Sequence, residues 1–262
     1  MIDPGTRWAL LMEYDGTGLC GWQRQDDAPS VQAILEQAAA RATGCAVDAA
    51  VAGRTDAGVH AAAQVAMVAM PSRFNARSVR DALNFHMKPH PVVVIRAVPA
   101  PDKWHPRFAA TGRTYRYVIL NRRARPGLLR HRAWHIPVPL DIAAMNLGAA
   151  HLLGWHDFSS FRAAACQAKS PLRTLDRLDV ERHADRVDIV AEARSFLHHQ
   201  VRNMVGSLVQ VGAGRWPTGR IADVLAARSR AVAGPTAPPD GLTLTGVRYE
   251  LDPFAGPAPE SD

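Results

Sequence analysis

The sequence of 262 residues predicts an α+β fold, in which two β-α-β-β-α-β halves join in a mainly antiparallel sheet. Three observations support this prediction. Strand-like and helix-like hydrophobic patterns follow each other in the same order in both halves of the chain. The length suits two domains or one large sheet. Hydrophobic residues make up 47% of the chain, and Gly and Pro number 19 each, which is typical of a folded globular protein.

The first half contains four predicted strands and two predicted helices. The strands are residues 7–14, 47–52, 62–70 and 91–98. The first helix, residues 30–42, begins with Ser30 as its cap and has Gly44 behind it. The second begins at Asn75, a residue type favoured at N-caps, and ends near Met87 because a Lys-Pro pair follows it.

The second half repeats this order with one additional helix. Its predicted strands are residues 113–120, 174–182, 186–193 and 242–251, and its helices are residues 140–153, 196–211 and 218–227. Such halves are ferredoxin-like units, and a central cleft between them would be the natural ligand site. We expect an N-terminal domain over residues 1–104, a C-terminal domain over 105–252, and a disordered Pro-rich tail over 253–262.

Several protein classes are excluded by the same sequence. Its longest apolar runs, residues 65–70 and 92–95, are far shorter than the roughly 18 residues of a membrane span. The N-terminus has no basic leader followed by an apolar run and a cleavage site. The three cysteines, Cys20, Cys45 and Cys166, are widely spaced, which favours small buried thiols in a reducing compartment. We therefore expect a cytoplasmic protein.

The formal net charge of +7 is concentrated in one part of the chain. Residues 103–140 contain nine basic residues and no acidic residue, so the rest of the chain is slightly acidic. Arginine greatly outnumbers lysine, and the planar guanidinium suits phosphate binding and stacking on bases. This segment predicts a polyanion partner. The alternative is a solvated basic face in a protein with a general preference for arginine.

Two weaker motifs favour other classes. A GxGxxG pattern at residues 16–21 resembles the loop of nucleotide-binding oxidoreductases, but the next predicted helix begins only near Ser30. We therefore expect these glycines to shape a loop. Two histidine pairs have the i, i+4 spacing of metal ligands but no third ligand at a fitting distance, which favours surface or stacking roles. They are His86 with His90, and His131 with His135.

Three segments carry the candidate site. AGRTDAGVHA, residues 52–61, places Asp56 in a glycine-flanked turn, where a local pairing with Arg54 is the simplest role. GRTYRY, residues 112–117, alternates aromatic and basic residues, as expected of a surface that stacks bases and holds phosphates. FLHHQVRNMVG, residues 196–206, predicts a helix with an isolated, buried Arg202, which requires an anion that Asp56 could supply.

Together these segments resemble the bacterial tRNA pseudouridine synthase A family. The resemblance covers about residues 7–251 in the family's order, and GRTDAGVH is its most specific motif. Ala63 and Trp104 depart from the family's usual Gly and Phe, and neither is a catalytic position. The matching stretches are EYDGTGLCGWQRQ, AGRTDAGVHA, FAATGRTYRY, LLGWHDFSSFR, FLHHQVRNMVGSLVQVG and APPDGLTLTGVRYE.

The resemblance implies isomerisation of uridine to pseudouridine at positions 38 to 40 of the tRNA anticodon stem-loop, without metal or organic cofactor. It implies that Asp56 is the nucleophile, that Arg202 lowers the pKa of its carboxyl group, and that Tyr115 stacks on the flipped base and is a candidate for removing the C5 proton. Attack on ribose C1′, attack on uracil C6 and assisted loss of a C2′ proton stay open. The implied substrate-binding residues are Arg54, Trp104, His105, Arg107, Phe108, Tyr115, Cys166, Gln167 and Lys169.

The family implies a homodimer in which one tRNA contacts both subunits, with neither a membrane nor DNA as a partner. Two alternatives come from other classes. A non-catalytic RNA-binding protein would share the basic segment but would not need Asp56, Tyr115 and Arg202 together. A nucleotide-dependent oxidoreductase would use the loop at residues 16–21 and bind a nicotinamide cofactor.

Overall fold

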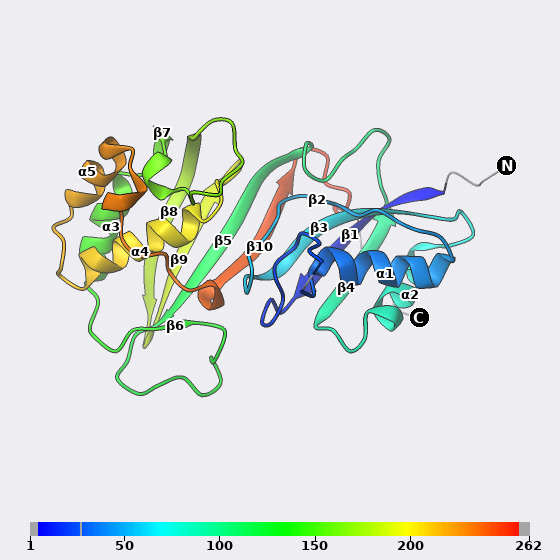
Figure 1. Cartoon of the computed structure of the whole chain (residues 1–262), viewed down its shortest axis with the longest axis horizontal. Coiled ribbons are helices and arrows are strands. Elements are labelled where there is room, and N and C mark those ends of the chain that lie inside the picture. The colour runs from blue at the N-terminus through cyan, green and yellow to red at the C-terminus, as the bar shows by residue number, and fades with distance from the viewer. Residues whose placement is uncertain (1–4, 27, 257–262) are drawn as a thin grey trace. The chain divides into compact units, whose positions relative to one another are not determined.

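The protein is described from a computed structural model, which covers residues 5–26 and 28–256. The chain divides into two compact units, Met1–Thr111 with Leu244–Asp262, and Gly112–Thr243 (Figure 1). This division differs from the expected boundary near residue 104, because the last strand of the chain returns to the first unit. A strand that completes a distant sheet cannot be recognised from local sequence patterns.

The first unit follows the predicted order of strands and helices. Its sheet has the order β4-β1-β3-β10, and β1 pairs antiparallel with both β3 and β4. The predicted strand at residues 47–52 shrinks to a two-residue β2, which pairs antiparallel with β3. The elements are β1 (Thr6–Tyr14), α1 (Val31–Thr43), β2 (Ala50–Val51), β3 (His60–Met70), α2 (Ala76–Met87), β4 (Val92–Pro99) and β10 (Leu242–Tyr249).

The predicted helix caps of this unit are confirmed. The side chain of Ser30 accepts a hydrogen bond from the backbone N–H of Ala33, and Gly44 ends α1 in the left-handed conformation. Asn75 caps α2 and forms a reciprocal capping box with Ser78. These caps satisfy backbone groups that a helix end otherwise leaves unpaired.

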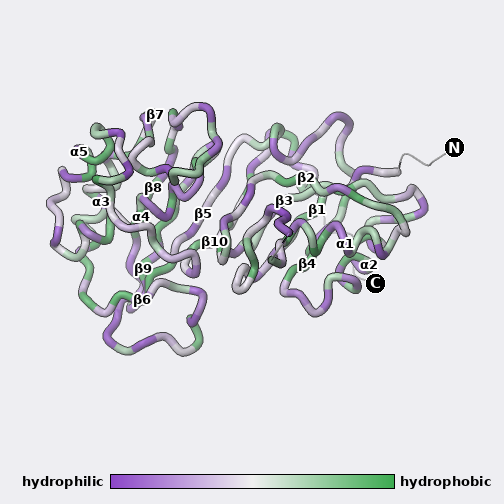
Figure 2. Tube along the Cα trace, in the orientation of Figure 1, coloured by the Kyte–Doolittle hydropathy of each residue, from purple (hydrophilic) through white to green (hydrophobic). Residues whose placement is uncertain are grey.

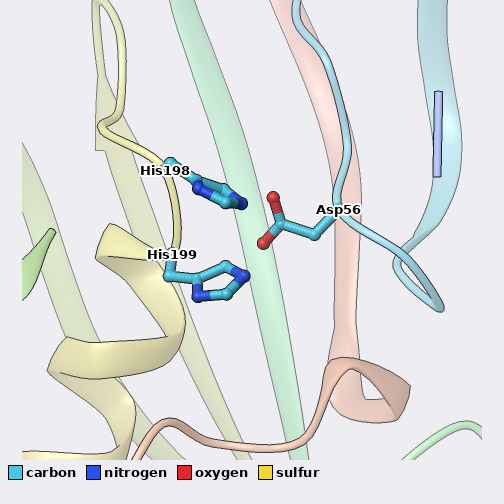
Figure 3. A group of neighbouring side chains, drawn as sticks. All are labelled: Asp56, His198 and His199. Atoms are coloured by element: carbon cyan, nitrogen blue, oxygen red, sulfur yellow. The ribbon is translucent and has the colours of Figure 1, made fainter. Parts of the chain in front are cut away.

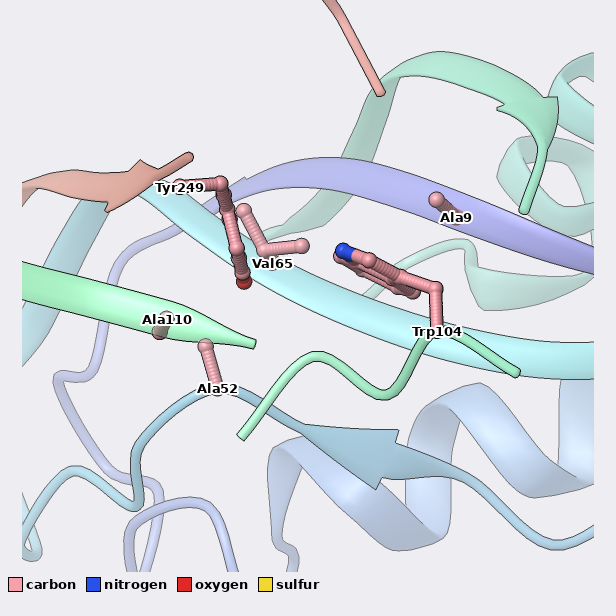
Figure 4. Packing of buried hydrophobic residues seen from close by; sticks show 6 residues of the cluster. All are labelled: Ala9, Ala52, Val65, Trp104, Ala110 and Tyr249. Carbon is pink, nitrogen blue, oxygen red and sulfur yellow. The ribbon is translucent and has the colours of Figure 1, made fainter. Parts of the chain in front are cut away.

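Side chains alternate across β1, so that both faces of this sheet are covered. Trp8, Leu10 and Met12 are buried on one face, and Ala9 is buried on the other. On the Ala9 side, Val65, Trp104 and Tyr249 join it in a hydrophobic cluster (Figure 4). The remaining buried members of this cluster are Ala52 and Ala110. The cluster ties the loop before β5 and the end of β10 to the first unit.

The second unit has the sheet order β5-β9-β8-β7. Neighbouring strands in this order pair antiparallel, whereas the short β6 runs parallel to β5. The elements are β5 (Ala110–Leu120), β6 (Trp134–His135), α3 (Ile142–Ala150), β7 (Gly154–Asp157), β8 (Leu172–His183), β9 (Arg186–Ala193), α4 (Gln200–Gly212) and α5 (Arg220–Ala227). The predicted α+β class with mainly antiparallel pairing is confirmed. A cleft between the units stays a prediction.

Three expectations about local structure differ from what the structure shows. The helix predicted from residue 196 begins only at Gln200, because His199 has a φ of 62°, in the left-handed region. None of the three cysteines is fully buried; Cys45 is exposed, and Cys20 and Cys166 are partly exposed and free. The strands β6 and β7 were not predicted, because two and four residues are too few to show a hydrophobic period.

The expected disordered tail is ordered at its start. The guanidinium of Arg96 donates hydrogen bonds to the carbonyl oxygens of Phe254, at 2.8 Å, and Gly256, at 2.9 Å. Phe254 also packs against the cluster of the first unit. The rest of the expected tail, residues 257–262, lies outside the described residues. Among the described residues, no helix is long and apolar enough to cross a membrane.

Candidate active site

Asp56 lies in the connection between β2 and β3, at the surface of the first unit. Its carbonyl oxygen accepts a hydrogen bond from the N–H of Val59, at 3.1 Å, which closes a tight turn. Its side chain is partly exposed, and the neighbouring Arg54 is exposed. Figure 3 shows the carboxylate extending from this loop. The turn predicted from the glycine-flanked motif is confirmed, and the carboxylate it carries is partly exposed.

A second loop, residues 16–22, supports the Asp56 turn. The N–H of Trp22 donates to the carbonyl of Thr55 at 3.0 Å, and the N–H of Gly58 donates to the carbonyl of Leu19 at 3.1 Å. Gly21, with a φ of 97°, comes so close that an added Cβ would lie 2.6 Å from the Thr55 carbonyl oxygen. The glycines of the GxGxxG pattern therefore shape a loop, as predicted, and Gly16 and Gly21 allow two backbones to meet.

Buried hydrogen bonds hold the same turn from beneath. The hydroxyl groups of Tyr14 and Thr55 lie 2.8 Å apart, and Nε2 of Gln64 donates to the Tyr14 hydroxyl at 3.1 Å and to the Gly53 carbonyl at 2.9 Å. Burial raises the pKa of Tyr14 to about 12, against the smaller opposing effect of its hydrogen bonds with Thr55 and Gln64. Sequence reasoning missed this network, since only the adjacency of Thr55 to Asp56 hinted at it.

In the second unit, Tyr115 lies on β5 opposite Ala191 of β9. It is 8% exposed, and its ring meets Phe196 edge to face, with centroids 5.4 Å apart. Because side chains alternate between the two faces along β5, Arg116 lies on the face opposite to Tyr115, where it is exposed. The contact with Phe196 fixes the plane of the Tyr115 ring, as a stacking platform requires.

The predicted stacking surface does not extend to Tyr117. This side chain is fully buried, and its hydroxyl donates to the carbonyl of Pro238 at 2.7 Å. Burial raises the pKa of Tyr117, while the nearby Arg202 opposes that shift and Asp240 adds to it. The expectation for Tyr117 from the alternating pattern is therefore wrong, because tertiary packing covers this side chain completely, whereas 8% of Tyr115 stays exposed.

Arg202 lies in the first turn of α4 and is half-buried rather than fully buried as predicted. Its Nε donates to the carbonyl of Ala237 at 2.8 Å, and the N–H of Ala237 donates back to the Arg202 carbonyl at 3.1 Å. The chain before Ala237 also packs tightly on α4, since a Cβ at Gly206 would lie 1.7 Å from the Pro235 carbonyl oxygen. The guanidinium is thus oriented by backbone that cannot shift.

Two histidines precede this helix and were not predicted to matter. His198 and His199 stack with ring centroids 4.1 Å apart in the segment before α4, drawn in Figure 3. The carbonyl of His198 accepts from the N–H of Ala163, and Cys166 closes a turn on the carbonyl of the same Ala163. The loop with Cys166, Gln167 and Lys169 is therefore tied to the start of α4. The last two of these side chains are exposed.

Comparison with known proteins now identifies the family. A family model described as "tRNA pseudouridine synthase" matches residues 10–109 and 149–250, which is most of the chain. The chain belongs to this tRNA pseudouridine synthase family. The matched ranges include Asp56, its supporting loop and Arg202, whereas Tyr115 falls between them.

Close relatives cover nearly the full length of this synthase. "tRNA pseudouridine synthase A" of Acidiphilium cryptum (strain JF-5) is 65% identical over 95% of this chain and 98% of its own length. The protein of the same name from Paramagnetospirillum magneticum (strain ATCC 700264 / AMB-1) is 58% identical over 93% and 95%. A solved structure titled "Crystal Structure of a Cbf5-Nop10-Gar1 Complex" matches 91% of this chain and 49% of that chain, with a TM-score of 0.36 and 11% identity. That likeness is too low to carry an argument.

The segment before β5 in this synthase contains the buried Trp104, the partly exposed His105 and the exposed Arg107 and Phe108. Phe108 is 74% exposed and stacks on His105, with centroids 4.6 Å apart, and Arg107 lies 5.9 Å from the Phe108 ring centre. Partial burial, and secondly the charge of Arg107, lower the pKa of His105. Trp104 is only 5% exposed and packs on Tyr249, and its expected contact with RNA stays a prediction.

Proposed function

We propose that this member of the tRNA pseudouridine synthase family isomerises uridines 38 to 40 in the anticodon stem-loop of tRNA, with Asp56 as the nucleophile. Isomerisation of uridine to pseudouridine in tRNA follows from family membership. The observation that carries the assignment of Asp56 is its partly exposed carboxylate on a turn braced by a second loop. A nucleophile needs such a fixed position, since misplacement of the reacting atom is costly.

The reaction exchanges one bond of C1′ for another and needs no outside reactant. The N-glycosidic bond from ribose C1′ to uracil N1 breaks, the uracil turns, and C5 bonds to C1′. The C5 proton leaves and N1 ends protonated, so the product is an isomer of the substrate. Asp56 acts by attack on C1′, by attack on C6 of uracil, or by assisting loss of a C2′ proton. Each route requires the carboxylate in its ionised form.

Arg202 supplies the positive charge for that ionised form. A guanidinium near a carboxylate favours the charged state and orients it. Support comes from the backbone hydrogen bond of its Nε, which fixes the direction of the group. The pairing is tested by a double-mutant cycle, because Arg202→Gln and Asp56→Asn have far less than additive effects on kcat if the two residues act together.

Tyr115 receives the base after it leaves the RNA stack. Extruding a base costs a few kcal/mol, and stacking on an aromatic ring offsets about 1–3 kcal/mol. Support comes from the edge-to-face contact with Phe196, which holds the Tyr115 ring in one plane. The hydroxyl of Tyr115 is the candidate acceptor of the C5 proton.

Residues on both units hold the tRNA. On the first unit these are the exposed Arg54, Arg107 and Phe108, the partly exposed His105 and the buried Trp104. On the second unit they are Cys166, Gln167 and Lys169. We propose that the enzyme is a homodimer, in which two copies of the basic segment widen the surface offered to a tRNA. As an enzyme of tRNA, it is proposed to act in the cytoplasm.

Tritium release from tRNA tests the reaction. The wild type and Asp56→Asn are incubated with tRNA transcripts labelled with [5-³H]uridine, without added metal or cofactor, and the modified positions are mapped. Release by the wild type alone, from positions 38 to 40, supports the proposal. Release by Asp56→Asn contradicts the nucleophile, and release from other positions contradicts the anticodon assignment. Binding without release by either protein would favour a non-catalytic RNA-binding protein.

A further inference from the structure

A basic loop projects from the second unit between β5 and β6. Residues 121–133, which we call the arm, carry five arginines and one histidine and no acidic residue. Figure 1 shows the arm beyond the end of the sheet at β6, and Figure 2 shows that much of it is hydrophilic. The basic residues, all exposed, are Arg122, Arg123, Arg125, Arg130, His131 and Arg132.

The base of the arm is firmly anchored. The N–H of Asn121 donates to the carbonyl of Asp185 at 2.7 Å, and its side-chain amide donates to Ile136 at 2.9 Å. Arg122 forms an ion pair with the Asp185 carboxylate at 2.8 Å. Leu129, in the middle of the arm, packs against Val118, Leu120 and Ala133. The arm is therefore attached at its ends and its centre, which limits the entropy that binding would cost.

Three arginines of the arm are not used by the fold. In the described part of the chain, no hydrogen bond or ion pair holds the guanidinium groups of Arg123, Arg125 and Arg130. Elsewhere in the same unit, arginines are neutralised by carboxylates, as in Arg186 with Asp188 at 2.9 Å and Arg228 with Asp157 at 3.5 Å. Like charges gathered without counter-charges repel one another, and a bound anion relieves that repulsion.

The position of the arm along β5 indicates which part of an RNA it reaches. Tyr115 and Leu120 are on the same strand, so five residues separate the proposed base platform from the start of the arm. At about 3.4 Å per residue this separation is roughly 17 Å, which is too far for one nucleotide to touch both. A molecule that spans the two is a long polyanion.

We propose that Arg123, Arg125 and Arg130 bind backbone phosphates of tRNA outside the anticodon stem-loop that supplies the target uridine. This inference rests on the proposed function. Forked guanidinium groups fit phosphate oxygens, and phosphate contacts carry affinity without reading sequence. The arm thus lets the enzyme favour whole tRNA over a short hairpin with the same target.

The test compares three variants with the wild type. The triple variant Arg123→Gln, Arg125→Gln and Arg130→Gln removes three unpaired charges. A control triple, Arg177→Gln, Arg220→Gln and Arg228→Gln, removes the same charge from arginines of the same unit that already pair with carboxylates. A third variant replaces the arm arginines with lysine, which keeps the charge. The Kd is measured from low to moderate salt for an unmodified tRNA transcript and for its isolated anticodon stem-loop hairpin.

The arm-to-glutamine variant is expected to bind whole tRNA at least tenfold more weakly at low salt, with the slope of log K against log salt reduced by about 2 to 3. Its hairpin affinity stays within about twofold of the wild type, because phosphate contacts elsewhere are untouched. The control triple and the lysine variant are expected to keep most of the wild-type slope of log K against log salt for whole tRNA. An unchanged tRNA slope overturns RNA binding by the arm, and an equal loss for tRNA and hairpin overturns its location outside the stem-loop.

Tritium release separates this inference from the proposed function. The control triple is expected to release tritium at the rate of the wild type, since none of its arginines belongs to the arm or to the proposed site. Failure of the wild type to release tritium from tRNA contradicts the proposed function itself. Normal release together with an unchanged binding slope contradicts only the role of the arm.

Discussion

At the scale of single residues, the turn that carries Asp56 depends on buried neighbours beneath it. The Tyr14 hydroxyl connects Gln64 to Thr55, the residue next to Asp56. The orientation of the Gln64 amide is fixed from both ends, because Nε2 donates to the Gly53 carbonyl and Oε1 accepts from the N–H of Val65. The Tyr14 hydroxyl thus bonds to both Gln64 and Thr55. The network therefore holds the turn in one conformation.

Removing the Tyr14 hydroxyl tests this network. Tyr14→Phe should lower kcat about tenfold while the Kd for tRNA changes little, because a misplaced carboxylate loses rate before it loses binding. The matched control is Tyr249→Phe in the same unit, whose buried hydroxyl donates to the Pro106 carbonyl at 2.9 Å. Both variants should lose about 1–2 kcal/mol of unfolding free energy. Equal kcat values for the two variants would mean that the Tyr14 network is structural only.

The hydroxyl of Tyr115 is tested separately from its ring. Tyr115→Phe keeps the ring that packs on Phe196 and removes only the candidate proton acceptor. Tritium release should fall about 10²- to 10⁴-fold, the usual contribution of a general acid or base, with tRNA affinity nearly unchanged. An unchanged rate would exclude the hydroxyl as the base, and Tyr115→Leu would then test stacking alone.

At the scale of elements, the loop at residues 16–22 and the turn at Asp56 behave as one unit. Backbone hydrogen bonds connect them, and Gly21 allows the two chains to touch. Sequence patterns predicted both loops and the glycine role, because turns depend on local chemistry. They could not predict the packing of one loop on the other, which depends on where β1 and β3 place them. The late start of α4 was likewise not predicted, since a left-handed conformation at a histidine such as His199 leaves no local sequence pattern.

Gly21→Ala should disrupt this contact. Its φ of 97° is strained for alanine, and the new Cβ would lie 2.6 Å from the Thr55 carbonyl oxygen. We expect a loss of about 2–4 kcal/mol in unfolding free energy and a large fall in kcat. Gly18→Ala is the control, since its φ of 76° is also positive but nothing lies within 4 Å of the added Cβ. Chemical denaturation gives the unfolding free energy of each variant, and the difference between them isolates the backbone contact at Gly21 from the strain of a positive φ. Equal losses in the two variants would contradict a stabilising role for this contact.

At the scale of the whole molecule, the two units are linked by more than one connection. β5 and β10 each run from one unit into the other, and the end of β10 completes the first sheet. Arg96 then holds Phe254 and Gly256, so the chain remains ordered past β10. The order of elements within each half was predictable from hydrophobic periods. The return of the last strand was not, since strand pairing between distant segments leaves no local pattern.

Global stability should fall at high pH because of buried tyrosine. Burial raises the pKa of Tyr14 from 10.0 to about 12, so the folded state retains a proton that the unfolded state loses. Its contribution is therefore fully present below pH 10 and is lost as the pH rises through 12, at most about 2–3 kcal/mol. The check is the unfolding free energy of the wild type and of Tyr14→Phe, measured by denaturation between pH 8 and 12. If the two free energies fell in parallel as the pH rises, the assignment of this loss to Tyr14 would be contradicted.

The sequence by itself determined the α+β class, the order of elements in each half, the helix caps and the family, through the motif around Asp56. These features depend on local hydrophobic periods, capping chemistry and a specific short motif. Only the tertiary structure decided that Tyr117 and Trp104 are buried, that Gln64 and Tyr14 brace the turn at Asp56, and that three arginines of the arm lack partners among the described residues. Burial and hydrogen bonding are properties of residues far apart in the chain, and folding alone brings those residues together.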